Sequence, residues 1–569
     1  MMPLPARHLL LSAVAALFFA ATLAGNWTSV RDAAIRAARD WTSWSDGGYR
    51  GNGEHTDAYR ELVEKNVFRG ERLYYKLSSQ DNLLTPAERS THLALSWAMS
   101  PSPVRFGDAE CVADEPAIVV SRFLDVEFPG YWLSAENSEA AIWKSGELAV
   151  DEKSLSRDPR SSVSPGRELL GVIVACSLIA VFVWWVLPED RMGRCGTGGA
   201  CIGAIAFFVL AVVLALSHTF VAPTGLGVYG GKAKLFYLLG GVPDGFFTDP
   251  AYSSYQPAYP PGLAFLTLVA YWVAGGCGEW LTQLIPVFTT ALTLGLMLKV
   301  GSSYFWMSLW TFAAFLGEQT LQVATFYYAE PFVALLTLLG WMRIREHHGD
   351  LLGWSILGLS GVFKTEGLFV VLAIWLSFVA CAVKADRTEV GGRVLFKWGV
   401  RLAFAMALPL AWHLSSHLAG ATFYDYAPIW DFDLARFGAA TEYLLKVSFL
   451  EPWRYGFAYP MAIAILIFAL MSVFTPRRGK IPVSLIAASS SSLTCIVLFA
   501  LVYSYSRAAD FRWHLWSSAA RLLWAPSLVL VREILDIITA SLRDGHVKQT
   551  RKRDLVIRRW LVEAPSLNG

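Results

Sequence analysis

The chain has 569 residues, of which 54% are hydrophobic, 14% aromatic and only 17% charged, and its mean hydropathy is +0.42. This composition excludes an ordinary soluble protein, which carries more charge, and indicates an all-α polytopic membrane protein. The net charge of +2 says little about partners, and the seven cysteines stand singly, which excludes a disulfide framework or a cysteine-rich metal site.

The chain begins with an apolar run within 1–25, which is either a cleaved signal peptide or a signal anchor. We expect a retained first transmembrane helix, because further apolar runs follow. Both alternatives export the next segment, 26–168, which is the only long polar stretch. A small α+β domain is predicted there from helical patterns and strand-like runs at Ser29–Asp40, Pro86–Ala98, Arg72–Leu77 and Ala117–Leu124.

The remaining sequence divides into a membrane domain, 169–540, and a basic cytoplasmic tail, 541–569. Arg191 and Arg194 place the loop between the first two spans of this domain in the cytoplasm. The loops 218–280, 419–455 and 504–515 then lie outside. Spans near the length of a bilayer crossing are expected at about 169–187, 200–217, 281–299, 303–323, 331–345, 396–418, 456–474, 482–503 and 516–538.

The apolar run Leu263–Gly276 decides the sidedness of everything after it. If this run crossed the membrane, the basic clusters at 343–348, 477–480 and 548–559 would all face outwards. Basic clusters at the ends of spans favour the cytoplasm, so we predict a non-crossing helix that lies in the outer interface. The tail is then a topology anchor near anionic lipid rather than a nucleic-acid-binding segment.

A second unusual run, Leu351–Ala385, has basic residues on both sides, so its two ends lie on the same side of the membrane. It is shorter than the roughly 40 residues that two full spans require. We therefore predict a short hairpin with Lys364 and Glu366 near its outer tip. Charges at that depth cost roughly 3 kcal/mol each and mark function, the alternative being an ion pair that only reaches the interface. The total is about twelve crossing or hairpin helices plus the interfacial helix.

The segment His218–Gly262 is rich in Gly, Pro and Tyr, and it is either a functional loop or a passive connector. Lysine and arginine suit a lipid-linked phosphate, a carboxylate can deprotonate an acceptor hydroxyl, and tyrosine faces suit sugar rings. A transporter cavity can hold the same groups. The polar residues expected at the outer face are Lys232, Lys234, Asp244, Asp249, Glu330, Lys364, Glu366, Asp510, Arg512, His514 and Arg521.

Four short motifs resemble the GT-C superfamily of polyprenyl-phosphate-sugar-dependent membrane glycosyltransferases, nearest to bacterial relatives of the protein O-mannosyltransferase and aminoarabinose transferase families (glycosyltransferase family 39-like). The resemblance covers about 219–530 and implies a bacterial inner or plasma membrane protein whose active side faces out. The motifs are KAKLFY (232–237) with YQPAYPP (255–261), AEP (329–331), LSGVFKTEG (359–367), and DFRWHL (510–515) followed by Arg521.

The resemblance also implies residue roles. Relatives carry an aspartate as catalytic base where this chain has Thr224, so Asp249 by preference, or Asp244, or Asp46 or Asp57 of the exported domain, is expected to replace it. A loss of catalysis, with the chain acting as an assembly protein, and a lipid-linked saccharide transporter or flippase remain alternatives. The other expected roles are phosphate binding by Lys232, Lys234, Lys364, Arg521 and His514, sugar or acceptor binding by Tyr237, Tyr255, Tyr259 and Glu366, and catalysis or divalent-cation binding by Glu330.

The expected partners follow from the same resemblance. They are a polyprenyl-phosphate sugar donor, a glycan, lipid or protein acceptor, and membrane lipid, with no nucleic acid. A divalent cation is the one candidate cofactor, and Glu330 would either hold it or orient a lysine.

Overall fold

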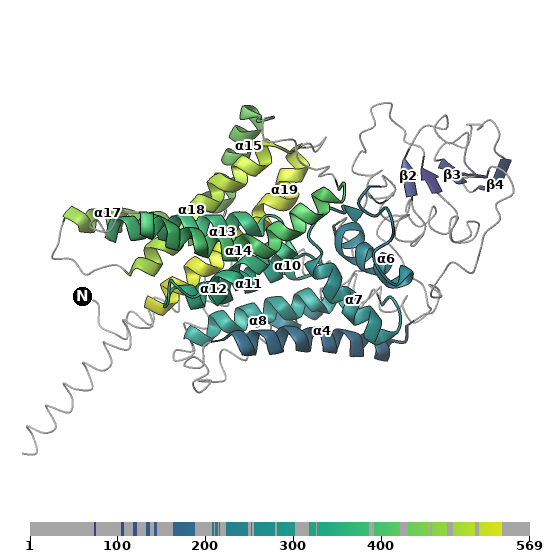
Figure 1. Ribbon diagram of the computed structural model, residues 1–569, viewed down its shortest axis with the longest axis horizontal. Coiled ribbons are helices and arrows are strands. Elements are labelled where there is room, and N and C mark those ends of the chain that lie inside the picture. The colour runs from purple at the N-terminus through teal and green to yellow at the C-terminus, as the bar shows by residue number, and fades with distance from the viewer. Residues whose placement is uncertain are drawn as a thin grey trace, which may run out of the picture.

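The computed structural model describes the helical part of the chain and the backbone of five short strands (Figure 1). Our predictions for 1–25 and 541–569, and for Asp46, Asp57, Asp249 and Asp510, fall outside the described residues. The described ranges, apart from the strands, are 163–187, parts of 207–216, 224–248, 252, 255–278, 281–301, 318–325, 327–385, 392–421, 431–455, 458–474, 482–506 and 511–537.

The strands lie within the predicted exported segment and form one mixed sheet in the order β2-β1-β3-β5-β4. β1 pairs in parallel with β2 and β3, whereas β5 pairs antiparallel with β3 and β4. β1 and β3 fall within the two predicted strand segments, whereas the other three strands were not predicted. The strands are β1 (Leu73–Tyr75), β2 (Val104–Phe106), β3 (Ile118–Ser121), β4 (Trp132–Glu136) and β5 (Ala141–Lys144).

The rest of the described chain is helical. Its elements are α4 (Pro165–Val186), η4 (Thr224–Gly231), α6 (Lys232–Leu239), α7 (Gly262–Ala274), η6 (Leu281–Gln283), α8 (Leu284–Gly301), α10 (Glu318–Thr325), α11 (Glu330–Ile344), α12 (Leu351–Phe363), α13 (Gly367–Ala385), α14 (Gly392–Leu418), α15 (Leu434–Leu445), η7 (Lys446–Leu450), α16 (Pro452–Tyr455), α17 (Ala458–Phe474), α18 (Val483–Ser504), α19 (Phe511–Leu522) and a final helix over 524–537.

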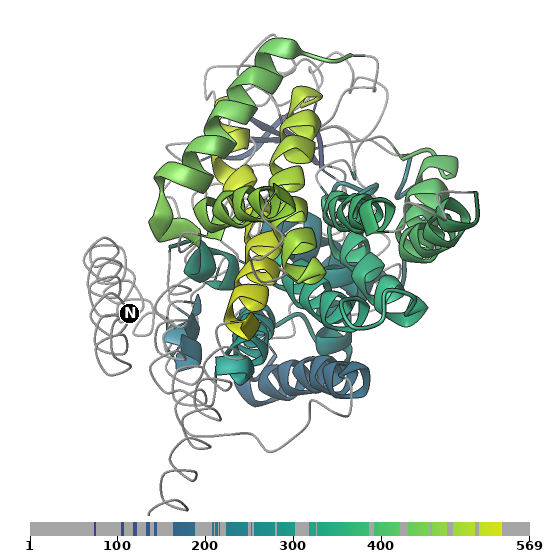
Figure 2. The ribbon, with the colours of Figure 1, turned by 90° about the vertical axis from the view of Figure 1, so that its left-hand side faces the viewer.

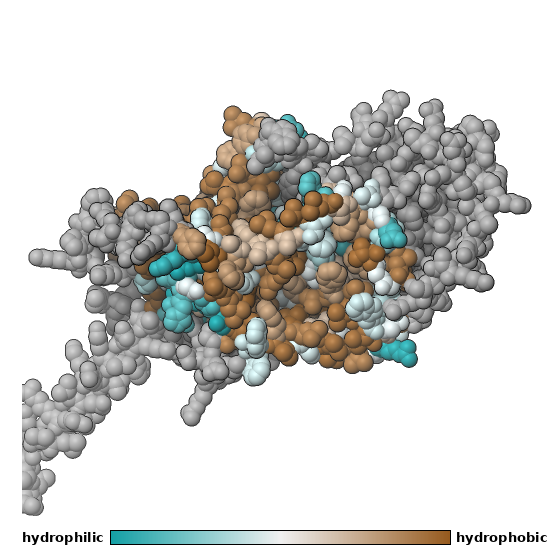
Figure 3. All heavy atoms as spheres, in the orientation of Figure 1, coloured by the Kyte–Doolittle hydropathy of each residue, from teal (hydrophilic) through white to brown (hydrophobic). Residues whose placement is uncertain are grey.

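Within the described residues, α4 and α18 are long and apolar enough to cross a membrane, and several shorter apolar helices accompany them. α4 lies along one edge of the helical part in both ribbon views (Figure 2). Its outward side chains are large and apolar, with Trp184 and Trp185 about two-thirds exposed. Hydrophobic residues also dominate the described surface in Figure 3. An apolar surface of this kind fits a membrane-associated protein.

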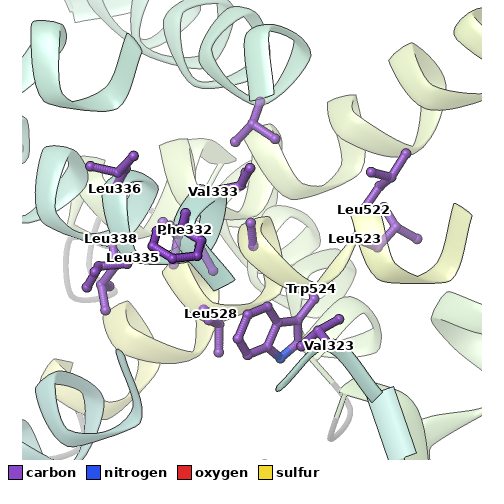
Figure 4. Close-up of a cluster of buried hydrophobic side chains, with 14 of the residues drawn as sticks. Val323, Phe332, Val333, Leu335, Leu336, Leu338, Leu522, Leu523, Trp524 and Leu528 are labelled. Atoms are coloured by element: carbon purple, nitrogen blue, oxygen red, sulfur yellow. The ribbon is translucent and has the colours of Figure 1, made fainter. Parts of the chain in front are cut away.

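The core is built around α11, whose residues are nearly all buried. Phe332 stacks on Phe363 at the end of α12, with ring centroids 4.6 Å apart. Figure 4 shows Phe332 and its α11 neighbours among Val323 of α10 and Trp524 and Leu528 of the last helix. α11 therefore connects the hairpin of α12 and α13 to the C-terminal helices.

Small residues let the helices around α11 approach closely, as is common where helices pack in membranes. A Cβ atom added at Gly340 of α11 would lie 2.8 Å from the backbone nitrogen of Leu357 in α12. A Cβ atom added at Gly358 would lie 1.8 Å from the carbonyl oxygen of Ala405 in α14. Only glycine fits these two positions, which fixes α12 between α11 and α14.

Contacts of α7 place both of its ends near one end of the bundle. Gly262 at its start packs against Phe363, and Ala270 packs against Gly171 near the start of α4. Glu168, also at the start of α4, accepts a hydrogen bond of 2.5 Å from the backbone nitrogen of Leu281, which follows α7. The opposite end of α4 lies beside the end of α11, where the carbonyl oxygen of Val186 accepts a hydrogen bond from Arg343.

The predicted hairpin corresponds to α12 and α13, which are separated by 364–366. Two other expectations need correction. The segment 419–455 was predicted to be a loop, but it contains α15, in which Leu434, Phe437, Ala440 and Leu444 follow helical spacing. Asp433 caps this helix by accepting a hydrogen bond from the backbone nitrogen of Arg436 at 3.0 Å.

The second correction concerns the predicted loop 504–515 and span 516–538. The structure has α19 from Phe511 and a separate helix over 524–537, with a break at Leu523. Pro526 has no N–H group to bond the carbonyl of Leu522, so a continuous helix would lose a hydrogen bond there. At the break, the carbonyl of Leu523 accepts from the backbone nitrogen of Ser527 at 3.2 Å and from the hydroxyl of Tyr459 at 2.8 Å.

Candidate functional site

A buried group of charges joins three parts of the chain, and we call Glu330, Lys364, Glu366 and Arg521 the Glu330 cluster. Oε1 of Glu330 accepts from Nζ of Lys364 at 2.8 Å and lies 3.0 Å from Nη1 of Arg521. Nζ of Lys364 lies 3.9 Å from Oε1 of Glu366. These side chains are only 4–7% exposed, so the ion pairs are largely shielded from water.

Local backbone rules explain why these residues meet. Glu330 opens α11 directly before Pro331, where an acid is favoured by the helix dipole and proline loses no hydrogen bond. Lys364 follows α12 in an extended conformation, which turns its side chain away from the helix path. Gly367 begins α13 so close to Ser360 that an added Cβ atom would lie 2.6 Å from its backbone. This tight turn places Lys364 and Glu366 against the start of α11.

Arg521 enters from the last turn of α19. Its guanidinium lies 3.6 Å from the ring centroid of Tyr328, a cation–π contact that holds the group beside Glu330. Tyr328 was not among the predicted site residues. Its only sequence signal is its place two residues before Glu330.

The polar segment around α6 approaches the same cluster through Tyr259. Its hydroxyl lies 3.2 and 3.3 Å from the two carboxylate oxygens of Glu366 and donates to them. Behind it, Nζ of Lys232 donates to the carbonyl oxygens of Gln256 at 3.2 Å and Tyr259 at 3.0 Å. Burial lowers the pKa of Lys232 to about 7. The two hydrogen bonds of Lys232 stabilise the turn that places Tyr259 beside Glu366.

A small cavity opens beside the four charged residues of the Glu330 cluster. Its apolar wall is formed by Val333, Val370, Phe499, Leu522 and Ala525. Oε2 of Glu330 is buried and has no hydrogen-bond partner among the described residues. The two cations that converge on Oε1 of Glu330 have the geometry in which lysine and arginine hold a phosphate oxygen.

The other predicted site residues lie away from this cavity. Tyr237 packs edge-on against Tyr271 at 6.1 Å, and Tyr255 is buried beside Tyr252 at 6.3 Å, both in a separate aromatic cluster. His514 shares a hydrogen bond of 2.8 Å with the hydroxyl of Ser506. The cavity lining also contains neither Lys234, which is half-buried, nor Asp244, which is exposed.

The described residues contain no group of three or more His, Cys, Asp and Glu side chains that could hold a metal ion. Glu330 and Glu366 are the two carboxylates of the cavity, and both contact the same lysine, Lys364. Comparison of the whole chain with protein-family models, curated proteins and solved structures gave no match.

Proposed function

We propose that the protein is a membrane glycosyltransferase, which moves a sugar from a polyprenyl-phosphate donor to an acceptor at the outer face. The observation that supports this most is that Lys364 and Arg521 converge on a single oxygen, Oε1 of Glu330, beside a cavity. This arrangement suits the phosphate of the donor, whose charge increases as the sugar leaves. The neighbouring Tyr259 offers a ring face for a sugar and a hydroxyl that orients Glu366.

The proposal includes about twelve crossing or hairpin helices and a helix α7 that rests in the outer interface. Support comes from α7, both of whose ends lie near the start of α4 and the turn between α12 and α13. The Glu330 cluster occupies that same end of the bundle. A lipid phosphate held in the outer leaflet could reach the cavity there while its chain stays in the bilayer.

In the proposed reaction an acceptor hydroxyl attacks the anomeric carbon of the donor sugar. The bond between that carbon and the phosphate oxygen breaks, and the polyprenyl phosphate leaves with the electron pair. Lys364 and Arg521 stabilise the phosphate. A carboxylate takes the hydroxyl proton, and Asp249 and Asp244 are our candidates from the sequence. The configuration at the anomeric carbon inverts.

The test uses the purified full-length protein in lipid nanodiscs with labelled polyprenyl-phosphate sugars and a membrane extract as acceptor. We expect the wild type to consume a donor and Lys364→Met to lose at least about 90% of that rate, since a phosphate contact is removed. Lys397→Met is the matched control, because Lys397 is exposed on α14 and lies outside the cavity. Donor turnover by Lys364→Met at the wild-type rate would overturn the proposal. Donor binding without loss of sugar would favour the inactive assembly protein.

A further inference from the structure

The Glu330 cluster already contains an anion at the position that a phosphate would occupy. Oε1 of Glu330 lies 2.8 Å from Lys364 and 3.0 Å from Arg521, which is the geometry of a phosphate oxygen held by two cations. The two carboxylates and two cations of the cluster sum to zero charge. A phosphate that entered without any rearrangement would add uncompensated negative charge to a buried site, which is strongly unfavourable.

The two carboxylates differ in their partners. Both oxygens of Glu366 accept from the hydroxyl of Tyr259, and its distance to Lys364 is 3.9 Å. Glu330 contacts both cations through one oxygen, whereas its second oxygen has no partner in the described part of the chain. Glu330 is therefore the carboxylate that occupies the position between both cations, which an incoming anion would have to take.

We propose that Glu330 is a built-in counter-anion, which occupies the anion position between Lys364 and Arg521 when the site is empty and yields it to an incoming phosphate group. The inference rests on the proposed function for the lipid-linked nature of the ligand. The displacement itself concerns any phosphate. Glu330 keeps the two cations in place without substrate, and it weakens phosphate binding because each binding event must break its ion pairs.

The test measures phosphate binding to the purified full-length protein by titration calorimetry. The probes are inorganic phosphate and dodecyl phosphate, which separate a free anion from a lipid headgroup. Glu330→Gln keeps the shape of the side chain and removes its charge, so we expect both probes to bind about ten-fold more tightly than to the wild type. Glu366→Gln is the matched control in the same cavity, and we expect a clearly smaller gain, because Glu366 does not contact Arg521.

The wild type supplies a second measurement that does not depend on the folding of a variant. Adding dodecyl phosphate should shift a carboxylate band in the infrared difference spectrum, because Glu330 loses two cationic partners. The band should persist in Glu366→Gln. Equal tightening in both variants, no tightening in Glu330→Gln, or no carboxylate shift on phosphate binding would each overturn the inference.

Donor turnover distinguishes this failure from that of the proposed function. If Glu330→Gln tightens phosphate binding but the wild type consumes no donor, the counter-anion stands and sugar transfer fails. If the wild type consumes donor but Glu330→Gln binds phosphate no more tightly, sugar transfer stands and the counter-anion is wrong. Absence of binding for both probes in both proteins also refutes the counter-anion.

Discussion

Helix α11 carries a group of buried or partly buried charges at each end, and the two groups are built differently. The Glu330 cluster lies at its start. At its end, Arg345 forms ion pairs with Glu533 and Asp536, and Asp536 also lies 3.5 Å from Arg532; we call these four residues the Arg345 cluster. The fifteen residues of α11 separate the two clusters by about 20 Å.

The charged groups of the Arg345 cluster pair with one another. Glu533 also accepts a hydrogen bond of 2.8 Å from the indole of Trp341, and Arg532 donates to the carbonyl oxygen of Leu296 at 2.6 Å. Each of its charged groups thus contacts an opposite charge, and these bonds join α8, α11 and the last helix. The Glu330 cluster instead lines a cavity. Buried charges alone do not indicate a binding site, but a cavity beside them favours one.

Breaking the Arg345 cluster should have the largest effect on stability. Arg345→Met leaves Glu533 and Asp536 without their shared cation, and removal of one partner from a buried pair costs about 3–5 kcal/mol. Thermal unfolding in detergent would show this as a large fall in the midpoint, with phosphate affinity unchanged in the folded protein. Arg436→Met is the control, since its pair with Asp433 is half-exposed and contributes no more than about 1 kcal/mol. Equal losses in the two variants would contradict the stabilising role of the Arg345 cluster.

The close approach of α11 and α12 should come next, because it supports both clusters. Gly340→Ala forces a methyl group to within 2.8 Å of Leu357 and 2.9 Å of the carbonyl oxygen of Gly353. Overpacking of this kind costs about 1–3 kcal/mol. Gly295→Ala on α8 is the matched control, since no atom lies within 4 Å of the added group and a helical alanine gains up to about 1 kcal/mol. The two variants should therefore move the unfolding midpoint in opposite directions, and movement in the same direction would contradict the packing argument.

Loss of Lys364 should affect binding more than folding. Glu330 keeps its ion pair with Arg521 at 3.0 Å in Lys364→Met, so the lost hydrogen bond costs only about 1.5 kcal/mol of stability. Phosphate affinity should fall about ten-fold, because one of two converging cations is gone. Calorimetry and thermal unfolding on the same preparation check both expectations. A stability loss as large as that of Arg345→Met would remove the difference between the two ends.

The sequence predicted that Glu330, Lys364, Glu366 and Arg521 lie at one face, because charge at the ends of spans sets sidedness. It did not predict which groups pair. Only Thr365 separates Lys364 from Glu366, yet Lys364 contacts Glu330 more closely, since the extended backbone after α12 directs it to α11. Tertiary packing decides such pairings, and hydropathy carries no signal for it.

The same limit applies to the helices of the outer segments. Aromatic and acidic composition predicted loops over 419–455 and 504–515, but α15 and the start of α19 lie there. The apolar spacing of Leu434, Phe437, Ala440 and Leu444 and the cap at Asp433 would have predicted α15. Pro526 would likewise have predicted the break before the last helix.

The smallest expected effect concerns the link between the α6 segment and the Glu330 cluster. Tyr259→Phe removes the hydroxyl that donates to both oxygens of Glu366, and a partly buried hydrogen bond of this kind contributes about 1 kcal/mol. Tyr505→Phe is the control; its ring packs on Phe432 at 5.9 Å, and loss of its hydroxyl should change stability by no more than about 0.5 kcal/mol. Thermal unfolding should rank the two variants in that order. If Tyr259→Phe also tightens phosphate binding as much as Glu330→Gln does, then Glu366 leaves the site as readily as Glu330, and the distinction between a fixed and a displaceable carboxylate fails.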